Sequence, residues 1–363
     1  MIKLYIQAGQ FFRNISHKLY VNYQTKEYTM TTRDDYKVLV TDYVWPSTEP
    51  ERKVLSEIGA TIIEAPDQEE DTLIALASDA DAIMTCFAQV TPGVVRAAKD
   101  CVVISRYGVG VDNIAVDVAT DLGIPVTYVP DYCVDEVSDH VMALLLTWNR
   151  QVLFYDQIAK RGEWSGIPAP VTLERLRGKN IGVLGLGRIG LSVSAKAKAF
   201  GLNVFGYDPY LPKDSVIPDY ITIRDFDGLL AESDYITVHT PLNDATVGLL
   251  SDREFELMKP SAYLINCARG PIIDESALYN ALKSNSICGA GLDVMEQAEP
   301  SRHDRMFELD NVIITPHVAF LSRDSVYELE VRTAQATRDV MQGKMPEFLV
   351  NPDVLSRSRI KLL

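Results

Sequence analysis

The chain has 363 residues, more than one hydrophobic core usually holds, so we expect two domains. Hydrophobic residues make up 47% of it and charged residues 23%, as in ordinary globular proteins. The net charge of −15 argues against a nonspecific nucleic-acid surface and against an anionic membrane as a partner, and no apolar run is long enough to cross a bilayer. Five cysteines without a close pair predict reduced thiols in a cytoplasmic protein and no metal site.

Short apolar runs alternate with helical segments from Lys37 onward. Residues 1–33, which precede this pattern, show no sustained periodicity, and we treat them as an extension of unknown role. The apolar runs predict buried parallel strands, and the segments between them predict crossover helices. We expect strands over 38–40, 60–64, 82–85, 102–105 and 125–129, and helices over 51–58, 71–77, 92–98 and 116–122. This series predicts one complete doubly wound domain.

A single long helix is expected next, over 136–161, and Gly162 ends it. A second series of strands and helices then begins at Ile181. Its strands are expected over 181–184, 203–208, 235–240, 262–266, 289–294 and 312–315. A last helix, over 327–341, lies outside both series. The predicted fold class is therefore α/β, with two doubly wound parallel-sheet domains.

Three glycines, Gly185, Gly187 and Gly190, follow the first strand of the second series and open a helix over 191–200. In a dinucleotide site the first glycine permits a tight turn, the second lets the backbone approach the pyrophosphate, and the third lets the helix lie close to the strand. Asp208 ends the following strand, where a carboxylate accepts from the ribose hydroxyls. The pattern predicts a Rossmann domain that binds NAD; the alternative is a tight turn that binds nothing.

Polar residues follow several other strands of the second series. Arg269 comes directly after an apolar strand, where a guanidinium fork suits a carboxylate or carbonyl oxygen. His317 follows another strand and is able to supply a proton near neutral pH, with Glu299 or Glu296 as its partner. A surface ion pair for Arg269 and a turn position for His317 are equally compatible with the residues alone.

Several segments together resemble the D-isomer-specific 2-hydroxyacid dehydrogenases. They are the glycine motif at 185–190, Asn266 to Glu275, Gly291 to Val294, Thr315 to His317, and Arg106 to Asn113, and the resemblance spans residues 37–345. It implies a flavodoxin-like substrate-binding domain made of residues 34–131 and 321–352, because the last helix returns to it. Residues 132–320 would form the NAD-binding domain.

The resemblance also implies catalytic residues. Arg269 would bind the substrate's carboxylate and reacting oxygen, and His317 would transfer the proton. Glu299 would orient His317 and raise its pKa, since a nearby anion favours imidazolium. One residue is inserted between Val294 and Glu299 relative to the family pattern, so Glu296 remains an alternative partner.

The implied cofactor and substrate contacts are more numerous. Asp293 would bond to the nicotinamide carboxamide, and Phe320 would form a wall of the substrate pocket, with Tyr107 or Phe87 beside it. The cofactor contacts would be Gly185, Gly187, Arg188, Ile189, Gly190, Asp208, Thr240, Cys267, Ala268, Arg269, Asp293 and His317. The substrate carboxylate would lie on the amides of Gly108, Val109 and Gly110, together with Arg269.

We therefore expect an enzyme that interconverts a D-2-hydroxyacid and its 2-keto acid with NAD(H), and a homodimer formed through the domain that holds the long helix.

A formate-type dehydrogenase is one alternative, although the residue that partners the histidine in those enzymes resembles Gln, whereas Glu299 precedes the proline here. An NADH-sensing co-repressor is another, because the bulky run 318–322 resembles that branch of the superfamily. A phosphoglycerate substrate is disfavoured, since Met84 to Phe87 contains no arginine. His140 is expected to be structural or interfacial.

Overall fold

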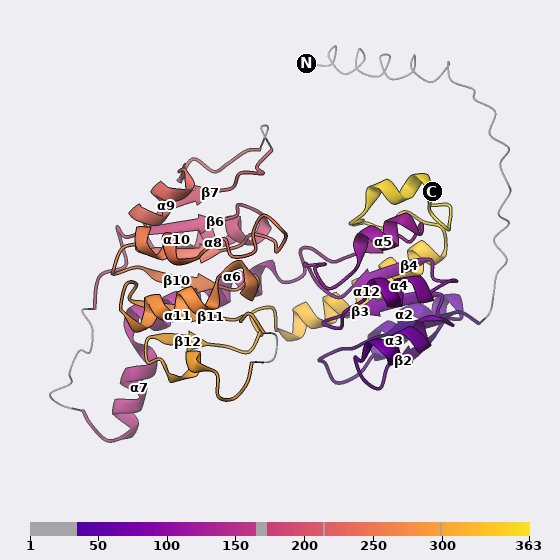
Figure 1. The fold of residues 1–363 in the computed structure, drawn as a ribbon, viewed down its shortest axis with the longest axis horizontal. Coiled ribbons are helices and arrows are strands. Elements are labelled where there is room, and N and C mark those ends of the chain that lie inside the picture. The colour runs from indigo at the N-terminus through magenta and orange to yellow at the C-terminus, as the bar shows by residue number, and fades with distance from the viewer. Residues whose placement is uncertain (1–34, 165–172, 213–214, 298–299) are drawn as a thin grey trace, which may run out of the picture. The chain divides into compact units, whose positions relative to one another are not determined.

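The structure, a computed structural model, describes residues 35–164, 173–212, 215–297 and 300–363 (Figure 1). The expected extension 1–33 lies outside these ranges. The described chain contains two parallel sheets, one of five strands and one of seven. The predicted fold class, two doubly wound α/β domains, is confirmed.

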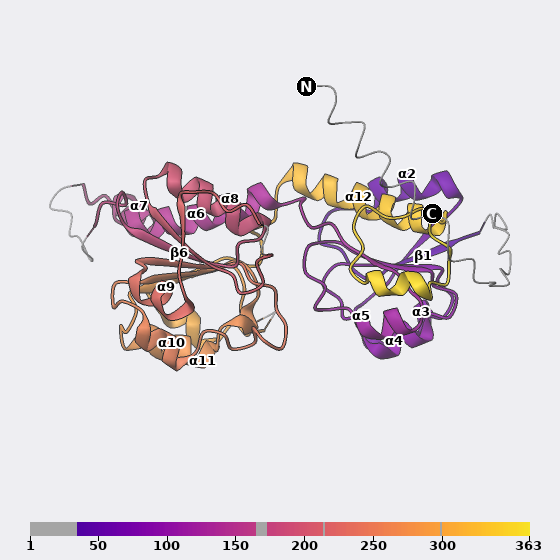
Figure 2. The same cartoon turned by 90° about the horizontal axis from the view of Figure 1, so that it is seen from above.

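The first sheet is formed by β1 (Lys37–Val40), β2 (Thr61–Glu64), β3 (Ala82–Thr85), β4 (Val103–Arg106) and β5 (Val126–Thr127). Its order, β2-β1-β3-β4-β5, is the flavodoxin-like one. Helix α2 (Glu49–Leu55) covers one face, and α3 (Glu70–Ala77), α4 (Pro92–Ala97) and α5 (Val116–Asp121) cover the other (Figure 2). The side chains of Val38 and Val40 pack toward α2, whereas Leu39 between them packs toward α3, as the alternation along a strand requires.

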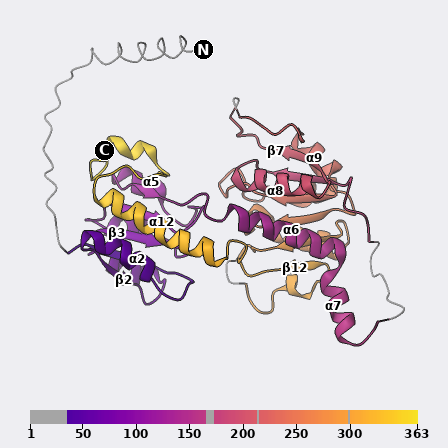
Figure 3. The ribbon, with the colours of Figure 1, turned by 180° about the vertical axis from the view of Figure 1, so that it is seen from behind.

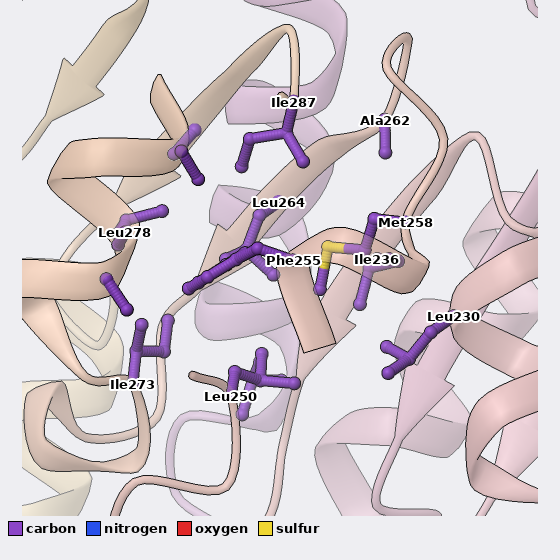
Figure 4. Close-up of a cluster of buried hydrophobic side chains, with 14 of the residues drawn as sticks. Leu230, Ile236, Leu250, Phe255, Met258, Ala262, Leu264, Ile273, Leu278 and Ile287 are labelled. Carbon is purple, nitrogen blue, oxygen red and sulfur yellow. The ribbon is translucent and has the colours of Figure 1, made fainter. Parts of the chain in front are cut away.

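The second sheet contains β6 (Asn180–Leu184), β7 (Asn203–Tyr207), β8 (Ile221–Ile223), β9 (Tyr235–Val238), β10 (Tyr263–Asn266), β11 (Gly289–Leu292) and β12 (Val312–Ile314). Its order, β12-β11-β10-β9-β6-β7-β8, is that of a Rossmann domain, with β6 as the first strand. Helices α6 (Val134–Arg150) and α8 (Arg188–Ala199) pack on one face. On the other face, α9 (Phe226–Glu232), α10 (Asp252–Leu257) and α11 (Glu275–Lys283) enclose an apolar core that includes Phe255, Leu264 and Leu278 (Figure 4).

The prediction of one helix over 136–161 is wrong. Two helices occupy this stretch, α6 and α7 (Val152–Lys160), and α7 turns away from α6 (Figure 3). Gln151 between them has a φ of 52°, in the left-handed region, so the helical hydrogen bonding cannot continue through it. Both its backbone N–H and its side-chain amide donate to the carbonyl of Trp148, at 3.0 and 2.9 Å. Apolar residues recur on both sides of this break, which is why the pattern predicted a single helix.

The last helix, α12 (Arg323–Met341), packs on the first sheet beside α2 (Figure 3). It begins four residues before the predicted start, at a capping box formed by Ser322 and Ser325. Its Thr337 hydroxyl donates to Ser105 Oγ on β4 at 2.7 Å, and Ser105 also accepts from Thr127 on β5 at 2.9 Å. A buried chain of hydroxyls thus fixes α12 against strands that lie more than 200 positions earlier in the sequence.

The segment after residue 352, which the sequence-based division assigned to neither domain, also lies against the first sheet's helices. Arg359 Nε donates to the carbonyl of Leu122 at 2.8 Å, just past the end of α5. Its Nη1 donates to the carbonyls of Ala98, Lys99 and Cys101 at 2.8–2.9 Å, just past the end of α4. One guanidinium therefore satisfies carbonyl groups in the two loops that follow α4 and α5.

In the described ranges, no helix is long and apolar enough to cross a membrane. The same ranges contain no group of three or more His, Cys, Asp or Glu side chains that is able to hold a metal ion.

We predict that Arg359→Ala lowers the free energy of unfolding by about 2–4 kcal/mol, because it removes charge-assisted hydrogen bonds from several carbonyls at once. The matched control is Arg357→Ala, two residues away, which breaks only an exposed ion pair with Asp121. That pair should contribute less than about 1 kcal/mol. Urea denaturation of both variants measures the difference, and equal losses would contradict the assignment.

Candidate active site

The carboxyl ends of five neighbouring strands of the second sheet lie at the same level. Leu184 pairs with Val238, Val238 with Asn266, Asn266 with Leu292, and Leu292 with Ile314. The turns that follow these residues therefore lie along one edge of the sheet, where ligands of doubly wound folds bind. Most of the residues that the sequence selected belong to these turns.

The turn between β6 and α8 allows a ligand to approach the backbone closely. Gly185 has a φ of 94°, and a Cβ there would lie 2.7 Å from the carbonyl oxygen of His239. A Cβ on Gly190 would lie 2.0 Å from the carbonyl oxygen of Gly185, whereas a Cβ on Gly187 would meet nothing within 4 Å. The open side of Gly187 lies at the start of α8, a helix that no side chain caps. These features fit an anionic group held by the first N–H groups of the helix, at Arg188, Ile189 and Gly190.

Asp208 follows β7, and its carboxylate reaches back to the glycine turn. Oδ2 accepts a hydrogen bond from the N–H of Leu186 at 3.0 Å, and Oδ1 accepts from the N–H of Tyr210 at 3.0 Å. An ionised carboxylate has about four acceptor positions, so two remain after these contacts. They suit the two hydroxyls of a ribose, and the negative charge disfavours a phosphate at the 2′ position.

Two further turns add small and polar groups to the same edge. The Thr240 hydroxyl is buried and has no hydrogen-bond partner among the described residues. Buried polar groups usually have a partner, and a bound ligand would supply one here. The next turn is held by Asn266, which accepts from the N–H of Ala268 and donates to the carbonyl of Arg269, both at 2.9 Å. Burial raises the pKa of the Cys267 thiol well above its usual value, so this side chain adds a neutral thiol to the turn.

Arg269 is held by two partners within the chain. Its Nε donates to both carboxylate oxygens of Asp112, at 3.1 and 3.3 Å, and its Nη1 donates to the carbonyl of Ala268 at 2.9 Å. A Cβ on Gly110 would lie 1.9 Å from Nη2, so the guanidinium lies against this glycine and would have to shift to admit a side chain there. The structure therefore brings Arg269 together with the expected substrate loop. The sequence analysis did not select Asp112, although it lies within the quoted segment Arg106 to Asn113.

The substrate loop differs in one detail from the expected row of three amides. The N–H of Gly108 already donates to the carbonyl of Arg106 at 3.0 Å, and the carbonyl of Gly108 accepts from Val129 at 3.1 Å. These bonds hold Gly108 at a φ of 144°, which a side chain rarely adopts. The amides of Val109 and Gly110 are thus the ones that an anion would use.

His317 lies in a strained turn built around Asp293. Its φ of 54° is uncommon for a residue with a side chain and costs on the order of 1–3 kcal/mol. Its N–H donates to the backbone carbonyl of Asp293 at 2.8 Å. The next two N–H groups donate to the Asp293 carboxylate: Val318 to Oδ1 at 3.0 Å and Ala319 to Oδ2 at 2.9 Å. Asp293 therefore holds three consecutive residues of the turn.

The same carboxylate is linked to α6. Thr315 Oγ1 donates to Asp293 Oδ1 at 2.5 Å, and His140 Nε2 lies 2.9 Å from Thr315 Oγ1. His140, expected to be structural or interfacial, thus belongs to the support of the His317 turn. The sequence contains no local signal for this contact, because His140 and Thr315 are 175 positions apart.

Two phenylalanines flank the imidazole of His317. The ring of Phe87 lies 5.2 Å from it and the ring of Phe320 lies 6.2 Å from it, both edge to face. Asp42 fixes the backbone of Phe87, accepting from its N–H at 2.6 Å. The sequence analysis named Phe87 and Tyr107 as alternatives for a second wall residue beside Phe320. Of these two, Phe87 lies near His317, as Phe320 does. Tyr107 is instead fully buried, and its hydroxyl donates to Glu51 at 3.0 Å.

The pKa of His317 shifts in the direction opposite to the one expected. Burial, followed by the positive charge of Arg269, lowers it from 6.5 to about 4, and the opposing influence of Asp293 is smaller. The expected increase depended on Glu299, which lies outside the described residues. Glu296, the alternative partner, is exposed, and its backbone N–H donates to Glu275 at 2.9 Å. No hydrogen bond or ion pair joins the Glu296 side chain to His317 in the described part of the chain.

Comparisons with known proteins agree with this geometry. Residues 142–319 match the family model described as D-isomer specific 2-hydroxyacid dehydrogenase, NAD binding domain. The chain is 38% identical over 322 residues to a D-3-phosphoglycerate dehydrogenase of Methanocaldococcus jannaschii, covering 87% of this chain and 59% of that protein. It is 34% identical over 299 residues to a glyoxylate reductase of Thermococcus litoralis, covering 80% of this chain and 86% of that protein. The chain thus spans little more than half the length of the first of these relatives.

A solved structure gives the same result. D-Lactate dehydrogenase from Aquifex aeolicus, complexed with NAD and lactic acid, superposes with a TM-score of 0.78 at 26% identity, covering 87% of this chain and 99% of that one. Similarity of this extent to several relatives, together with the matching family model, shows that the chain belongs to the D-isomer specific 2-hydroxyacid dehydrogenase family.

Proposed function

We propose that this protein interconverts a D-2-hydroxyacid and its 2-keto acid with NAD(H). The observation that carries the proposal is the meeting of three groups at the carboxyl edge of one sheet: the glycine turn with Asp208, the Arg269 guanidinium, and the His317 imidazole. The space beside Gly187, and the Thr240 hydroxyl that has no hydrogen-bond partner among the described residues, fit a dinucleotide. When bound, NADH would supply the hydride that reduces the keto carbon.

The chain's own residues would do the remaining work. Arg269 would bind the carboxylate and the keto oxygen through Nη2, since Nε and Nη1 are already bonded to Asp112 and Ala268. Gly110 lies beside that nitrogen, and the amides of Val109 and Gly110 would share the carboxylate. His317 would give its proton to the keto oxygen in reduction and take it back in oxidation. Glu299 would orient His317 and offset the effect of burial on its pKa, with Glu296 as the alternative.

The domains would divide these tasks. Residues 34–131 and 321–352 would form the substrate-binding domain, which supplies the loop at Gly108. Residues 132–320 would form the NAD-binding domain. Its expected contacts at Arg188, Ile189, Ala268 and Asp293 remain part of this proposal.

We propose an unphosphorylated substrate. No arginine lies in the turn from Met84 to Phe87, and Arg106, on the neighbouring strand β4, is buried and bonded to Asn113 and to the carbonyl of Tyr107. The phenyl rings of Phe87 and Phe320 beside His317 suit an apolar side chain instead. An NADH-sensing co-repressor is the second candidate, because the bulky Phe320 distinguishes this chain from many dehydrogenases of the family. A formate-type dehydrogenase is disfavoured by Glu299 in place of Gln.

A panel of 2-keto acids with graded side chains, assayed with NADH and with NADPH, tests the reaction and the cofactor together. We expect NADH to be preferred by at least about 10-fold in kcat/KM, equivalent to about 1.4 kcal/mol, because Asp208 repels a 2′-phosphate. Unphosphorylated acids should react faster than a phosphorylated one. A preference for NADPH would refute the role of Asp208, and binding of NADH without turnover of any acid would favour the co-repressor.

Substitutions of the three proposed catalytic residues, Arg269, Glu299 and His317, test the proton transfer. His317→Ala should lower kcat about 10²–10⁴-fold, and Arg269→Lys should chiefly raise KM for the keto acid. Reduction requires protonated His317, so its rate falls as the pH rises through the pKa of that group. An adjacent ionised Glu299 raises this pKa; Glu299→Gln should therefore move the alkaline limb to lower pH. Glu296→Gln is the matched control, and a shift in that variant alone would transfer the role to Glu296.

We further propose that the protein is a homodimer. Val152 and Leu153 at the start of α7 are about half exposed, and Trp164, after the end of α7, is 78% exposed; each is an apolar side chain that a second copy of the chain would cover. Light scattering at micromolar concentration should give twice the mass of the chain, and a monomer mass would refute the proposal.

A cytoplasmic location is also proposed, on the basis of five cysteines that are all free. Imaging of a tagged protein checks it.

A further inference from the structure

A directed chain of hydrogen bonds connects α6 with the turn that holds His317. Both oxygens of the Asp293 carboxylate accept backbone N–H groups, so the Thr315 hydroxyl must donate its only hydrogen to Oδ1. The Thr315 oxygen is then an acceptor toward His140. His140 Nε2, at 2.9 Å, must therefore carry the hydrogen, which fixes the tautomer of this imidazole.

This series of hydrogen bonds matters because the conformation of the His317 turn depends on one buried carboxylate, that of Asp293. The Asp293 side chain is 1% exposed and binds two of the three N–H groups that its residue holds in the turn. A left-handed residue at 317 lets the three consecutive N–H groups reach different oxygens of the same residue, Asp293. A rotation of the carboxylate would release Val318 or Ala319 and with it the backbone conformation of His317. Thr315 is the hydroxyl donor to that carboxylate, and His140 holds Thr315.

We propose that Thr315 and His140 are positioning residues for the acid–base group of the proposed reaction. They orient the Asp293 carboxylate, and the carboxylate holds the backbone of His317 in the left-handed conformation that presents its imidazole to the substrate. The inference rests on the proposed function for the identity of the reaction. The geometric claim, that Thr315 helps to fix the backbone conformation of His317, does not depend on the proposed function.

Two substitutions at Thr315 separate the hydroxyl from the shape of the side chain. Thr315→Val keeps the branched shape and removes the donor, whereas Thr315→Ser keeps the donor and removes a methyl group. We expect Thr315→Val to lower kcat on the order of 10²-fold, the effect of a small misplacement of a reacting group, with a much smaller change in KM for the keto acid. Thr315→Ser should restore kcat to within about threefold of the unmodified protein. Thr222→Val, at an exposed position of strand β8, controls for the substitution itself.

A second measurement does not require turnover. The chain has only five histidines, so ¹⁵N-histidine NMR signals are assignable by single substitutions. His140 should be the tautomer with hydrogen on Nε2. The His317 signals should shift in Thr315→Val and in His140→Leu, but much less in Thr315→Ser and in His140→Gln, whose amide keeps a donor near the same place.

The outcomes are distinct. Unchanged His317 signals in Thr315→Val, or hydrogen on Nδ1 alone in His140, would overturn the inference. A fall in thermal stability that is equal in Thr315→Val and Thr315→Ser, with kcat unaffected in both, would also overturn it, since it would indicate packing alone. If the unmodified protein turns over no 2-keto acid while the NMR shifts appear as expected, the proposed function fails and the positioning of His317 by Thr315 is supported.

Discussion

The alignment of parallel strand ends in the second sheet is the constraint on which the candidate site depends. The pairing of Leu184, Val238, Asn266, Leu292 and Ile314 places five turns from different parts of the chain at one edge. A shift of one strand by a single residue would move its turn by about 3.3 Å and reverse the faces of its side chains. The apolar cores on both faces of the sheet fix this alignment, so the hydrophobic effect indirectly sets the geometry of the polar groups.

Opposing charges then determine what the polar groups are able to do. Arg269 supplies the positive charge that a carboxylate needs, but the same charge, added to burial, lowers the pKa of His317 to about 4. Asp112 and Asp293 act in the other direction, and Asp112 also occupies the Nε edge of Arg269. A further anion beside His317 would act in the same direction as these two carboxylates, and this is the role that we propose for Glu299 or Glu296.

The sequence predicted what depends on local pattern and left out what depends on distant contacts. The two strand series and the glycine turn follow from apolar periodicity and from residue types at fixed spacing, and the structure confirms the fold class. The break at Gln151 was missed because a left-handed residue other than glycine has no reliable local signal. The three-residue strand β8 is too short to show periodicity. Asp112 pairs with Arg269 across 157 positions, and His140 with Thr315 across 175, so only the folded chain shows these contacts.

The central claim is a reaction of defined stereochemistry, in which a 2-keto acid positioned by Arg269 is reduced with NADH and protonated by His317. Chiral chromatography of the product formed from a 2-keto acid, NADH and the unmodified protein tests it most directly. The account predicts the D-2-hydroxyacid, formed in a one-to-one ratio with the NADH consumed, and almost none when Ala replaces His317. An L-product, or NADH oxidation without a hydroxyacid product, would contradict it.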